Sequence, residues 1–233
     1  MGRTSQDGRP PLGRLTVMPA RTVTAETLGC WLRGCAAAIA EQRDYLTQLD
    51  AAIGDADHGA NMTRGFAAVQ VKLDELDGGT PPGKLLIAAG TTLVSTVGGA
   101  SGPLWGSGLR KAGRSLGDAE QVEPAALVDA LEAALGAIVE LGAAERGDKT
   151  MVDALAPAVD TLRSALADGK TLEDALAGAR AAADEGMRAT VPMVARKGRA
   201  SYLGERSVGH QDPGATSVAI VIAALERAVH EAA

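Results

Sequence analysis

Apolar side chains recur at intervals of three and four residues along nearly the whole chain, and this spacing constrains the fold more than any other feature. In one typical segment, apolar residues occupy positions 62, 66, 69, 73 and 76. Such spacing places them on one face of an α-helix. Only 2% of the residues are aromatic although 46% are hydrophobic, so the core must be built from small aliphatic side chains that suit closely packed helices. We therefore predict an all-α fold.

Breaks that contain glycine or proline divide this pattern into eight predicted helices. They cover about 24–53, 59–77, 83–97, 103–117, 124–142, 148–166, from 171 to an irregular stretch at 194–212, and from 213 to near the end. Residues 218–222 could form a strand on composition, but they lie inside a longer apolar run. Because most connections are short, neighbouring helices should be antiparallel. We predict an eight-helix antiparallel barrel or bundle, formed by one domain over residues 24–233.

Residues 1–23 contain four arginines but no apolar stretch of the kind found in secretion signals. We interpret them as a flexible N-terminal arm, with translation from Met18 as an open alternative. The net charge of −6 argues against nonspecific binding of nucleic acid, and no apolar run is long enough to cross a membrane. Cys30 and Cys35 are five positions apart on one predicted helix, so they should point away from each other and remain reduced in the cytoplasm.

Three aspartates, Asp50, Asp55 and Asp57, fall within eight residues at the first break. Carboxylates so near one another in the sequence repel each other unless cations or water compensate their charge. Oxygen ligands suit Mg²⁺ or Ca²⁺ better than zinc. A calcium-binding loop that began at Asp55 would need a glutamate at its twelfth position, where Phe66 stands. The pattern therefore favours a magnesium site, and a solvated acidic turn remains the alternative.

Three later breaks also contain residues that can bind anions. Small residues at 98–103 precede a helix, whose N-terminus attracts negative charge, although a tight turn between helices would have the same composition. The break at 147–151 has a lysine and a threonine at a helix start, and a simple helix cap explains it equally well. The stretch 194–212 has four cations that could face phosphates, a partner's acidic surface or solvent: Arg196, Lys197, Arg199 and Arg206.

The order of the four breaks along the chain predicts that they form one site. In a ring of antiparallel helices, the connections after the first, third, fifth and seventh helices lie at the same end. These are the four breaks described above. His58 and His210 also lie in the breaks, and each could carry a phosphoryl group or act as a general base. The aspartates beside His58 favour a hydrogen-bonding role in a site that works by positioning and charge neutralisation.

The segments 53–59, 97–104, 147–151 and 196–217 closely resemble motifs of the nucleotide-binding L subunit of dihydroxyacetone kinase, in the same order. The resemblance extends from about Leu28 to the last helix. It implies a helical barrel with ADP or ATP at one rim and two Mg²⁺ ions on Asp50, Asp55 and Asp57. It further implies a nucleotide site, with His58 and Arg199 as catalytic residues, lined by His58, Asn61, Ala100, Ser101, Gly142, Met151, Arg199, Asp212, Pro213 and Gly214.

The resemblance also implies partners, because in this family dihydroxyacetone is bound by a separate K subunit. Stand-alone L subunits resemble the phosphoenolpyruvate-dependent type, in which a phosphohistidine on an M subunit rephosphorylates the bound ADP. We therefore expect a cytoplasmic phosphotransferase subunit of the phosphoenolpyruvate–glycerone type. Two alternatives remain: an ATP-dependent kinase for dihydroxyacetone or another short ketose, and a regulatory module that reports its nucleotide state to a transcription regulator.

Overall fold

The computed structural model describes residues 22–232, and this part of the chain is predominantly α-helical. It contains nine α-helices, one 3-10 helix and one pair of short strands. In chain order these are β1 (Val23–Thr24), α1 (Ala25–Glu41), α2 (Arg43–Ile53), α3 (His58–Asp74), α4 (Pro82–Thr96), α5 (Ser101–Leu116), β2 (Gln121–Val122), α6 (Pro124–Gly142), α7 (Val152–Ala167), α8 (Leu172–Ala189), η1 (Arg199–Ser207) and α9 (Pro213–Glu231).

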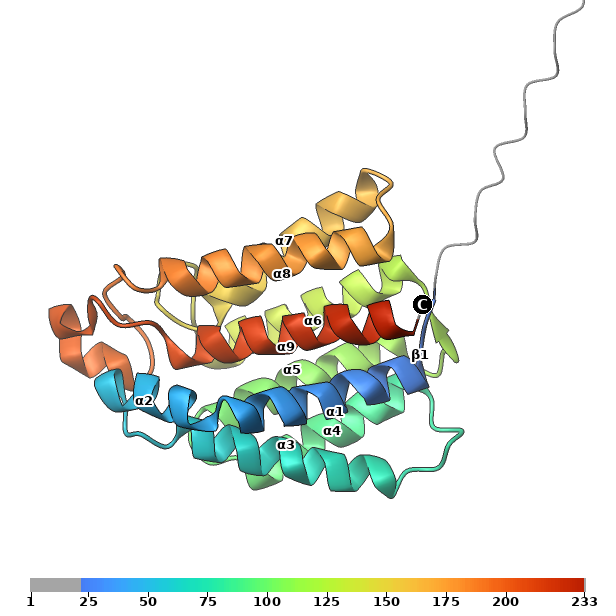
Figure 1. The fold of residues 1–233 in the computed structure, drawn as a ribbon, viewed down its shortest axis with the longest axis horizontal. Coiled ribbons are helices and arrows are strands. Elements are labelled where there is room, and N and C mark those ends of the chain that lie inside the picture. The colour runs from blue at the N-terminus through green and yellow to red at the C-terminus, as the bar shows by residue number, and fades with distance from the viewer. Residues whose placement is uncertain (1–21, 233) are drawn as a thin grey trace, which may run out of the picture.

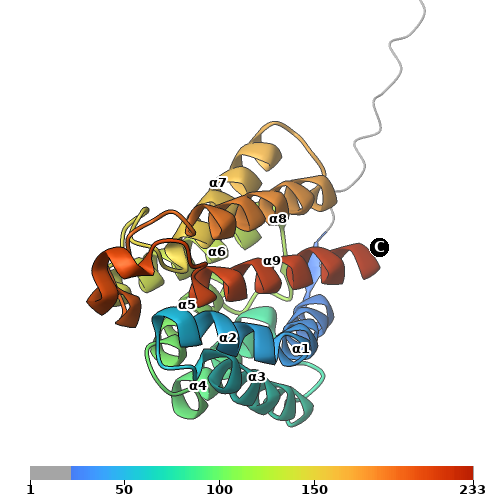
Figure 2. The ribbon, with the colours of Figure 1, turned by 60° about the vertical axis from the view of Figure 1, so that its left-hand side comes forward.

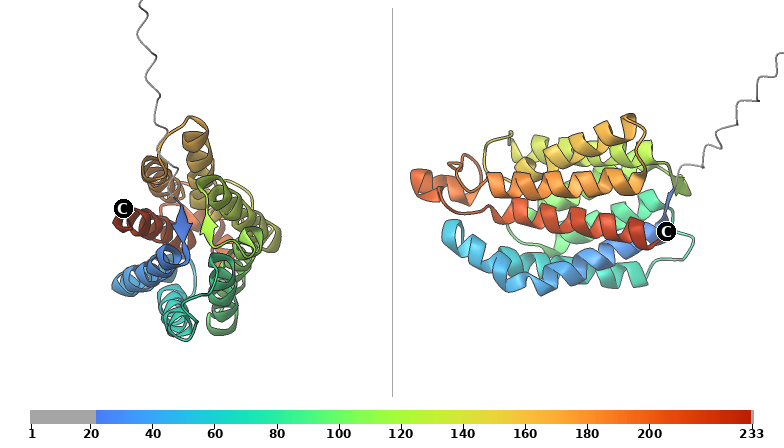
Figure 3. Two further views of the ribbon diagram at one scale, coloured as in Figure 1. Left: turned by 90° about the vertical axis from the view of Figure 1, so that its right-hand side faces the viewer. Right: turned by 45° about the horizontal axis from the view of Figure 1, so that its top comes forward.

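The long helices lie side by side as a bundle, and most run along its long axis (Figure 1). Consecutive helices pack against each other, with α4 along α5, α5 along α6 and α7 along α8. Helix α9 packs against α1, α7 and α8, so the last helix closes the ring seen in the end view (Figure 3). The predicted all-α antiparallel bundle is confirmed. Residues 218–222 lie inside α9, so the strand considered for them does not form.

The first predicted helix is in fact two helices, which raises the number of α-helices between residues 22 and 232 to nine. The break is at Gln42, whose φ of −99° and ψ of 14° are not helical. Neither glycine nor proline marks it, and the Gln42 N–H still donates to the carbonyl of Ala38. Ile39 and Leu46 on either side are both fully buried, so the apolar periodicity continues through the bend. The periodicity alone therefore could not reveal it.

The core is aliphatic, as predicted, with one edge-to-face aromatic pair between Phe66 and Trp105 whose ring centroids are 6.4 Å apart. Two glycines let α4 and α5 approach closely. A Cβ atom on Gly90 would lie 2.6 Å from the carbonyl oxygen of Gly106, and one on Gly106 would lie 2.6 Å from that of Gly90. Larger side chains would force the helices apart. This close packing fixes the position of the loop that joins α4 to α5.

The two ends of the bundle differ. At one end β1 pairs with β2 in an antiparallel arrangement, with Val23 opposite Val122. At the other end lie the α2–α3, α4–α5 and α6–α7 connections and the irregular stretch that contains η1 (Figures 1 and 2). Of the predicted arm, residues 1–23, positions up to 21 and the alternative start at Met18 lie outside the described residues. No helix between residues 22 and 232 combines the length and apolar character that a membrane crossing needs.

Candidate functional site

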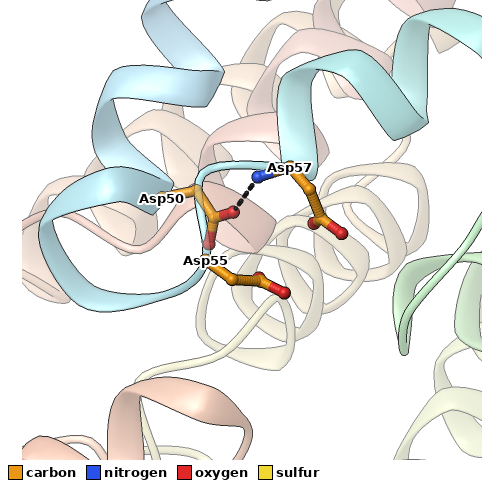
Figure 4. Close-up of side chains that lie close together, drawn as sticks. All are labelled: Asp50, Asp55 and Asp57. Carbon is orange, nitrogen blue, oxygen red and sulfur yellow. Dashed lines mark hydrogen bonds between the residues drawn. The ribbon is translucent and has the colours of Figure 1, made fainter.

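The three predicted metal-ligating aspartates come together where α2 meets α3. Asp50 is buried on α2, and Asp55 and Asp57 lie on the following loop. One carboxylate oxygen from each residue lies within 4.8 Å of the others, and the side chains border a common space (Figure 4). Oxygen donors this close to one another suit a divalent cation such as Mg²⁺. The residues present therefore fit the predicted metal.

The backbone around the cluster holds the Asp50 carboxylate in place. Its Oδ2 accepts the N–H of Asp57 at 2.8 Å and the N–H of His58 at 3.1 Å. The loop also passes very close to the carboxylate, because a Cβ atom on Gly54 would lie 2.0 Å from Asp50 Oδ1. Ala56 has a φ of 60°, a left-handed conformation that costs a non-glycine residue about 1 kcal/mol or more. The loop thus keeps a strained shape around the cluster.

His58 connects three helices through its ring. Nδ1 lies 3.1 Å from the hydroxyl of Ser101 at the start of α5, and Nε2 lies 2.7 Å from the hydroxyl of Ser217 on α9. Burial lowers the pKa of His58 and outweighs the opposing effects of Asp50 and Asp57. Burial thus favours the neutral ring, and both of its nitrogens have hydroxyl partners. This geometry favours a positioning role over that of a phosphoryl carrier.

Asp212 forms the N-cap of α9, where its Oδ2 accepts the N–H of Ala215 at 2.7 Å. Burial raises the pKa of Asp212 to about 7. The Ala215 N–H and the nearby Lys149 oppose this rise, whereas Asp153 and Asp50 add to it. Pro213 and Gly214 follow in the first turn of α9 and lie beside the same cavity as Asp212. The site therefore contains a carboxyl group that can change protonation near neutral pH.

Residues 190–212, which we call the basic arm, carry cations over the aspartate cluster. Arg199 begins η1, and its guanidinium lies 3.0 Å from Asp55 Oδ2. The side chain of Arg199 is 68% exposed, so this ion pair adds little stability and leaves the guanidinium accessible. Lys197 lies beside the cavity as well. The basic arm thus brings positive charge to the carboxylates.

Two neighbouring cavities occupy this end of the bundle. The first, of about 210 Å³, contains the charged side chains of the site, and we call it the polar cavity. Residues from all four breaks line it, which confirms that the breaks meet at one end. The other, of about 380 Å³, is lined mainly by apolar residues of α5, α6 and the α6–α7 connection. They share five lining residues: Ala100, Leu104, Thr150, Met151 and Lys197. One elongated ligand could therefore place a polar part in the first cavity and an apolar part in the second.

Most of the predicted site residues line the polar cavity. These are Asp50, Asp55, Asp57, His58, Ala100, Ser101, Met151, Arg199, Asp212, Pro213 and Gly214. Gly142 lines the apolar cavity instead. Asn61 is not among the lining residues of either: it is buried further along α3, and its Oδ1 accepts from Arg64 at 2.7 Å. The His210 side chain is exposed, and only its carbonyl faces inward, toward Lys149.

Several residues that line the cavities were not among the predicted site residues. Lys149, Thr150 and Lys197 line the polar cavity and lie in breaks that were recognised, but nothing in the pattern showed which way each side chain points. Leu104 and Trp105 also line it, although their spacing is that of ordinary core residues of α5. For these two the sequence contained no separate signal.

Comparison with known proteins agrees with this geometry. Residues 52–227 match the family model described as the DAK2 domain. The chain belongs to the DAK2 domain family. This DAK2 chain is 42% identical over 201 residues to the Escherichia coli K12 protein named PEP-dependent dihydroxyacetone kinase, ADP-binding subunit DhaL, and the match covers 86% of this chain and 95% of that one. It is 41% identical to an L-erythrulose 1-kinase of Mycolicibacterium smegmatis, covering 80% of this chain but only 32% of that longer protein.

Solved structures of a dihydroxyacetone kinase share the fold of this chain. The DAK2 chain superposes on the dihydroxyacetone kinase of C. freundii with a TM-score of 0.66 and 26% identity, over 97% of this chain and 38% of that one. A second structure of that kinase, in complex with AMP-PNP and Mg²⁺, matches with the same TM-score and 25% identity, again over 97% and 38% of the two chains.

Proposed function

We propose that this DAK2 chain is the ADP- or ATP-binding subunit of a dihydroxyacetone kinase and transfers a phosphoryl group to dihydroxyacetone held by a partner K subunit. The observation that carries the proposal is the cluster of Asp50, Asp55 and Asp57, with oxygens within 4.8 Å of one another at the edge of a cavity. The names of the relatives support it, since the E. coli protein is called an ADP-binding subunit. Two Mg²⁺ ions on these carboxylates would neutralise the nucleotide's phosphate charge.

The rest of the site suits a nucleotide. The glycine loop before Ser101 and the N-terminus of α5 offer backbone N–H groups to a phosphate. The apolar cavity beside Gly142 has the character that an adenine ring requires. Arg199 is exposed enough to turn from Asp55 to a phosphoryl oxygen and to stabilise charge there during transfer. His58, held between two serine hydroxyls, fixes the relative positions of α3, α5 and α9 around the phosphates.

The phosphoryl donor and the partners form the finer part of the proposal. We assign the chain to the phosphoenolpyruvate-dependent type, in which the ADP stays bound and a phosphohistidine of an M subunit rephosphorylates it. The relatives from E. coli and Lactococcus lactis, named as PEP-dependent and PTS-dependent subunits, support this assignment. A cytoplasmic location fits the two free cysteines. A secondary role in binding a transcription regulator can be tested by pull-down with and without nucleotide.

Nucleotide content decides between this proposal and its nearest alternative. The purified DAK2 chain is denatured, and the released nucleotide is identified and quantified. We expect close to one ADP per chain, and transfer to dihydroxyacetone only when the K and M subunits are both present. A protein that loses its nucleotide during purification and works with free ATP and the K subunit would contradict the phosphoenolpyruvate-dependent assignment.

The alternative is an ATP-dependent kinase for a short ketose, favoured by the 41% identity to the L-erythrulose 1-kinase. This DAK2 chain spans about a third of that relative, so it would need a substrate-binding partner. Assays with free ATP and either erythrulose or dihydroxyacetone, in the presence of the K subunit, separate the two candidates. Turnover of erythrulose with free ATP and the K subunit, without phosphoenolpyruvate or the M subunit, would establish the second.

A further inference from the structure

Lys149 lines the polar cavity, but its ammonium group is bound to backbone carbonyls of residues that do not line the cavity. Its side chain is almost completely buried, with 1% exposure, although it is a lysine in a glycine-containing connection. The Nζ atom donates to the carbonyl oxygens of His210 at 2.5 Å, Thr190 at 2.8 Å and Met193 at 3.2 Å. The carbonyl oxygen of Val191 lies a little further away, at 3.5 Å. An ammonium group has three donors, so these carbonyls occupy all of them.

The carbonyls that Lys149 binds belong to both ends of the basic arm. Thr190 and Met193 lie where the arm leaves α8, and His210 lies where it enters α9. Two further contacts join the same ends: the Asp212 N–H donates to Thr190 Oγ1 at 3.0 Å, and the Gly209 N–H donates to the carbonyl of Val191. The two ends of the arm are thus joined, and we call this junction the neck; Lys149 is bound inside it.

The connection that contains Lys149 is itself held firmly. The Asp153 carboxylate accepts the N–H of Gly147 at 2.5 Å and the N–H of Thr150 at 2.8 Å. Lys149 has a φ of 62°, which a side-chain-bearing residue adopts only when its surroundings enforce it. The Arg196 N–H also donates to the carbonyl of Asp148, so the arm touches this connection a second time. The neck therefore has a rigid support.

Beyond the neck, little holds the basic arm against the rest of the bundle. Its apolar contact with α2 is a small cluster in which Ile53 meets Ala195, Ala200 and the partly buried Leu203. Its polar contacts are the backbone bond from the Arg196 N–H to the Asp148 carbonyl and the exposed ion pair between Arg199 and Asp55 on the loop after α2. At the end next to α9, Gln211 Nε2 also lies 3.3 Å from the Tyr45 hydroxyl of α2. The position of Arg199 over the carboxylates should thus depend strongly on the geometry of the neck.

We infer that Lys149 is a positioning residue that fastens both ends of the basic arm and so keeps Lys197 and Arg199 over the phosphate end of the cavity. The inference rests on the proposed function, since it concerns transfer from a nucleotide bound in that cavity. The sequence left open whether this lysine binds an anion or belongs to a simple helix cap. Here the backbone carbonyls occupy its ammonium group instead, and the cations that face the ligand come from the arm.

The test compares Lys149→Met, which keeps an unbranched side chain one atom shorter but removes its charge and donors, with the unaltered chain. Three quantities are measured: amide hydrogen exchange over residues 194–209, magnesium-dependent affinity for ADP, and the rate of a single phosphoryl transfer. We expect faster exchange in the arm and a transfer rate lower by about 100-fold, because small displacements of a positioned group have effects of that size. The affinity for ADP should change by less than about 3-fold, since the aspartates and the glycine loop are untouched.

Two further variants separate positioning from general destabilisation. Leu162→Ala opens a cavity in the core of α7, away from the site, and should lower the melting temperature without accelerating exchange in the arm selectively. Thr190→Val removes the Asp212 contact from the other side of the neck and should accelerate arm exchange in the same direction as Lys149→Met. It also provides the test if the Met variant does not fold.

Each result is decisive. A large loss of ADP affinity with unchanged exchange in the arm would make Lys149 a phosphate ligand and overturn the inference. An equal loss of transfer rate in Leu162→Ala, at the same loss of melting temperature, would overturn it as well. If the unaltered chain showed no magnesium-dependent affinity for ADP, the proposed function would fail, while the exchange data would still report on the fastening of the arm.

Discussion

Gly54→Ala should damage the metal site through a single methyl group. The added Cβ atom would lie 2.0 Å from Asp50 Oδ1 and 3.0 Å from the carbonyl oxygen of Asp50. Non-bonded carbon and oxygen atoms need more than 3 Å, so the carboxylate must move by about 1 Å. Its bonds to the N–H groups of Asp57 and His58, now 2.8 and 3.1 Å, would then exceed hydrogen-bonding distance or bend sharply.

The magnitude follows from those two bonds. A hydrogen bond to a charged group contributes about 1.5–3 kcal/mol, so losing one and weakening the other should destabilise the fold by about 2–4 kcal/mol. Displacing a metal-ligating carboxylate through its supporting contacts typically costs about 10–100-fold in metal affinity. Isothermal titration of ADP in the presence of Mg²⁺ measures the second effect, and denaturant unfolding in EDTA measures the first.

Gly136→Ala is the matched control. Gly136 lies within α6, and a Cβ atom there would meet nothing within 4 Å. Replacing a mid-helix glycine by alanine should stabilise the fold by about 0.5–1 kcal/mol and leave ADP affinity unchanged. If Gly54→Ala bound magnesium and ADP as tightly as Gly136→Ala, the close approach of Gly54 to Asp50 would have no functional meaning and our account of the loop would be wrong.

Three further predictions concern the charged groups of the site. Asp55→Asn should weaken the binding of Mg²⁺ and ADP together by about 10-fold or more, because one of three carboxylate charges is lost; equal nucleotide retention in both proteins would argue against the metal assignment. Arg199→Ala should lower the transfer rate by about 100-fold but shift the free energy of unfolding by less than about 1 kcal/mol, since its ion pair is exposed; calorimetry alongside single-turnover kinetics checks both. Because the pKa of Asp212 is raised from 3.8 to about 7, its stabilising contribution is complete below pH 3.8 and is lost as the pH rises through 7. The free energy of unfolding is measured in EDTA for the unaltered chain and for Asp212→Asn. The difference between the two should fall as the pH rises from 3.8 to 7, by at most about 1.4 kcal/mol per pH unit. A difference that does not change with pH would contradict the raised pKa.

Much of the fold could be predicted because its information is local. Apolar spacing and the glycine and proline breaks are properties of neighbouring residues, and they gave the helices and their antiparallel order. The division of the first helix at Gln42 could not be predicted, because the apolar pattern runs through it from Ile39 to Leu46. The β1–β2 pair was also missed. It joins Val23 to Val122 across about a hundred residues, and each strand has only two residues.

The site was predictable to the extent that topology determines it. The order of the breaks required that they meet at one end, and the aspartates, Ser101 and Arg199 do line one cavity there. The direction of a side chain is a different matter, since it depends on partners far away in the sequence. Lys149 points into the neck because the carbonyls of Thr190 and His210 lie there, and no pattern near residue 149 records that. Asn61 is bound by the nearby Arg64, but it also lies next to Gly98 of the glycine loop, which is far away in the sequence.

The ion pair between Arg199 and Asp55 has a consequence for how the site would be loaded. Its guanidinium lies 3.0 Å from an oxygen that a divalent cation would also need. Without a metal, the arginine serves as a counter-ion to the Asp55 carboxylate. A divalent cation bound by that oxygen would compete with the guanidinium, which would then be free to turn to the phosphates of a bound nucleotide.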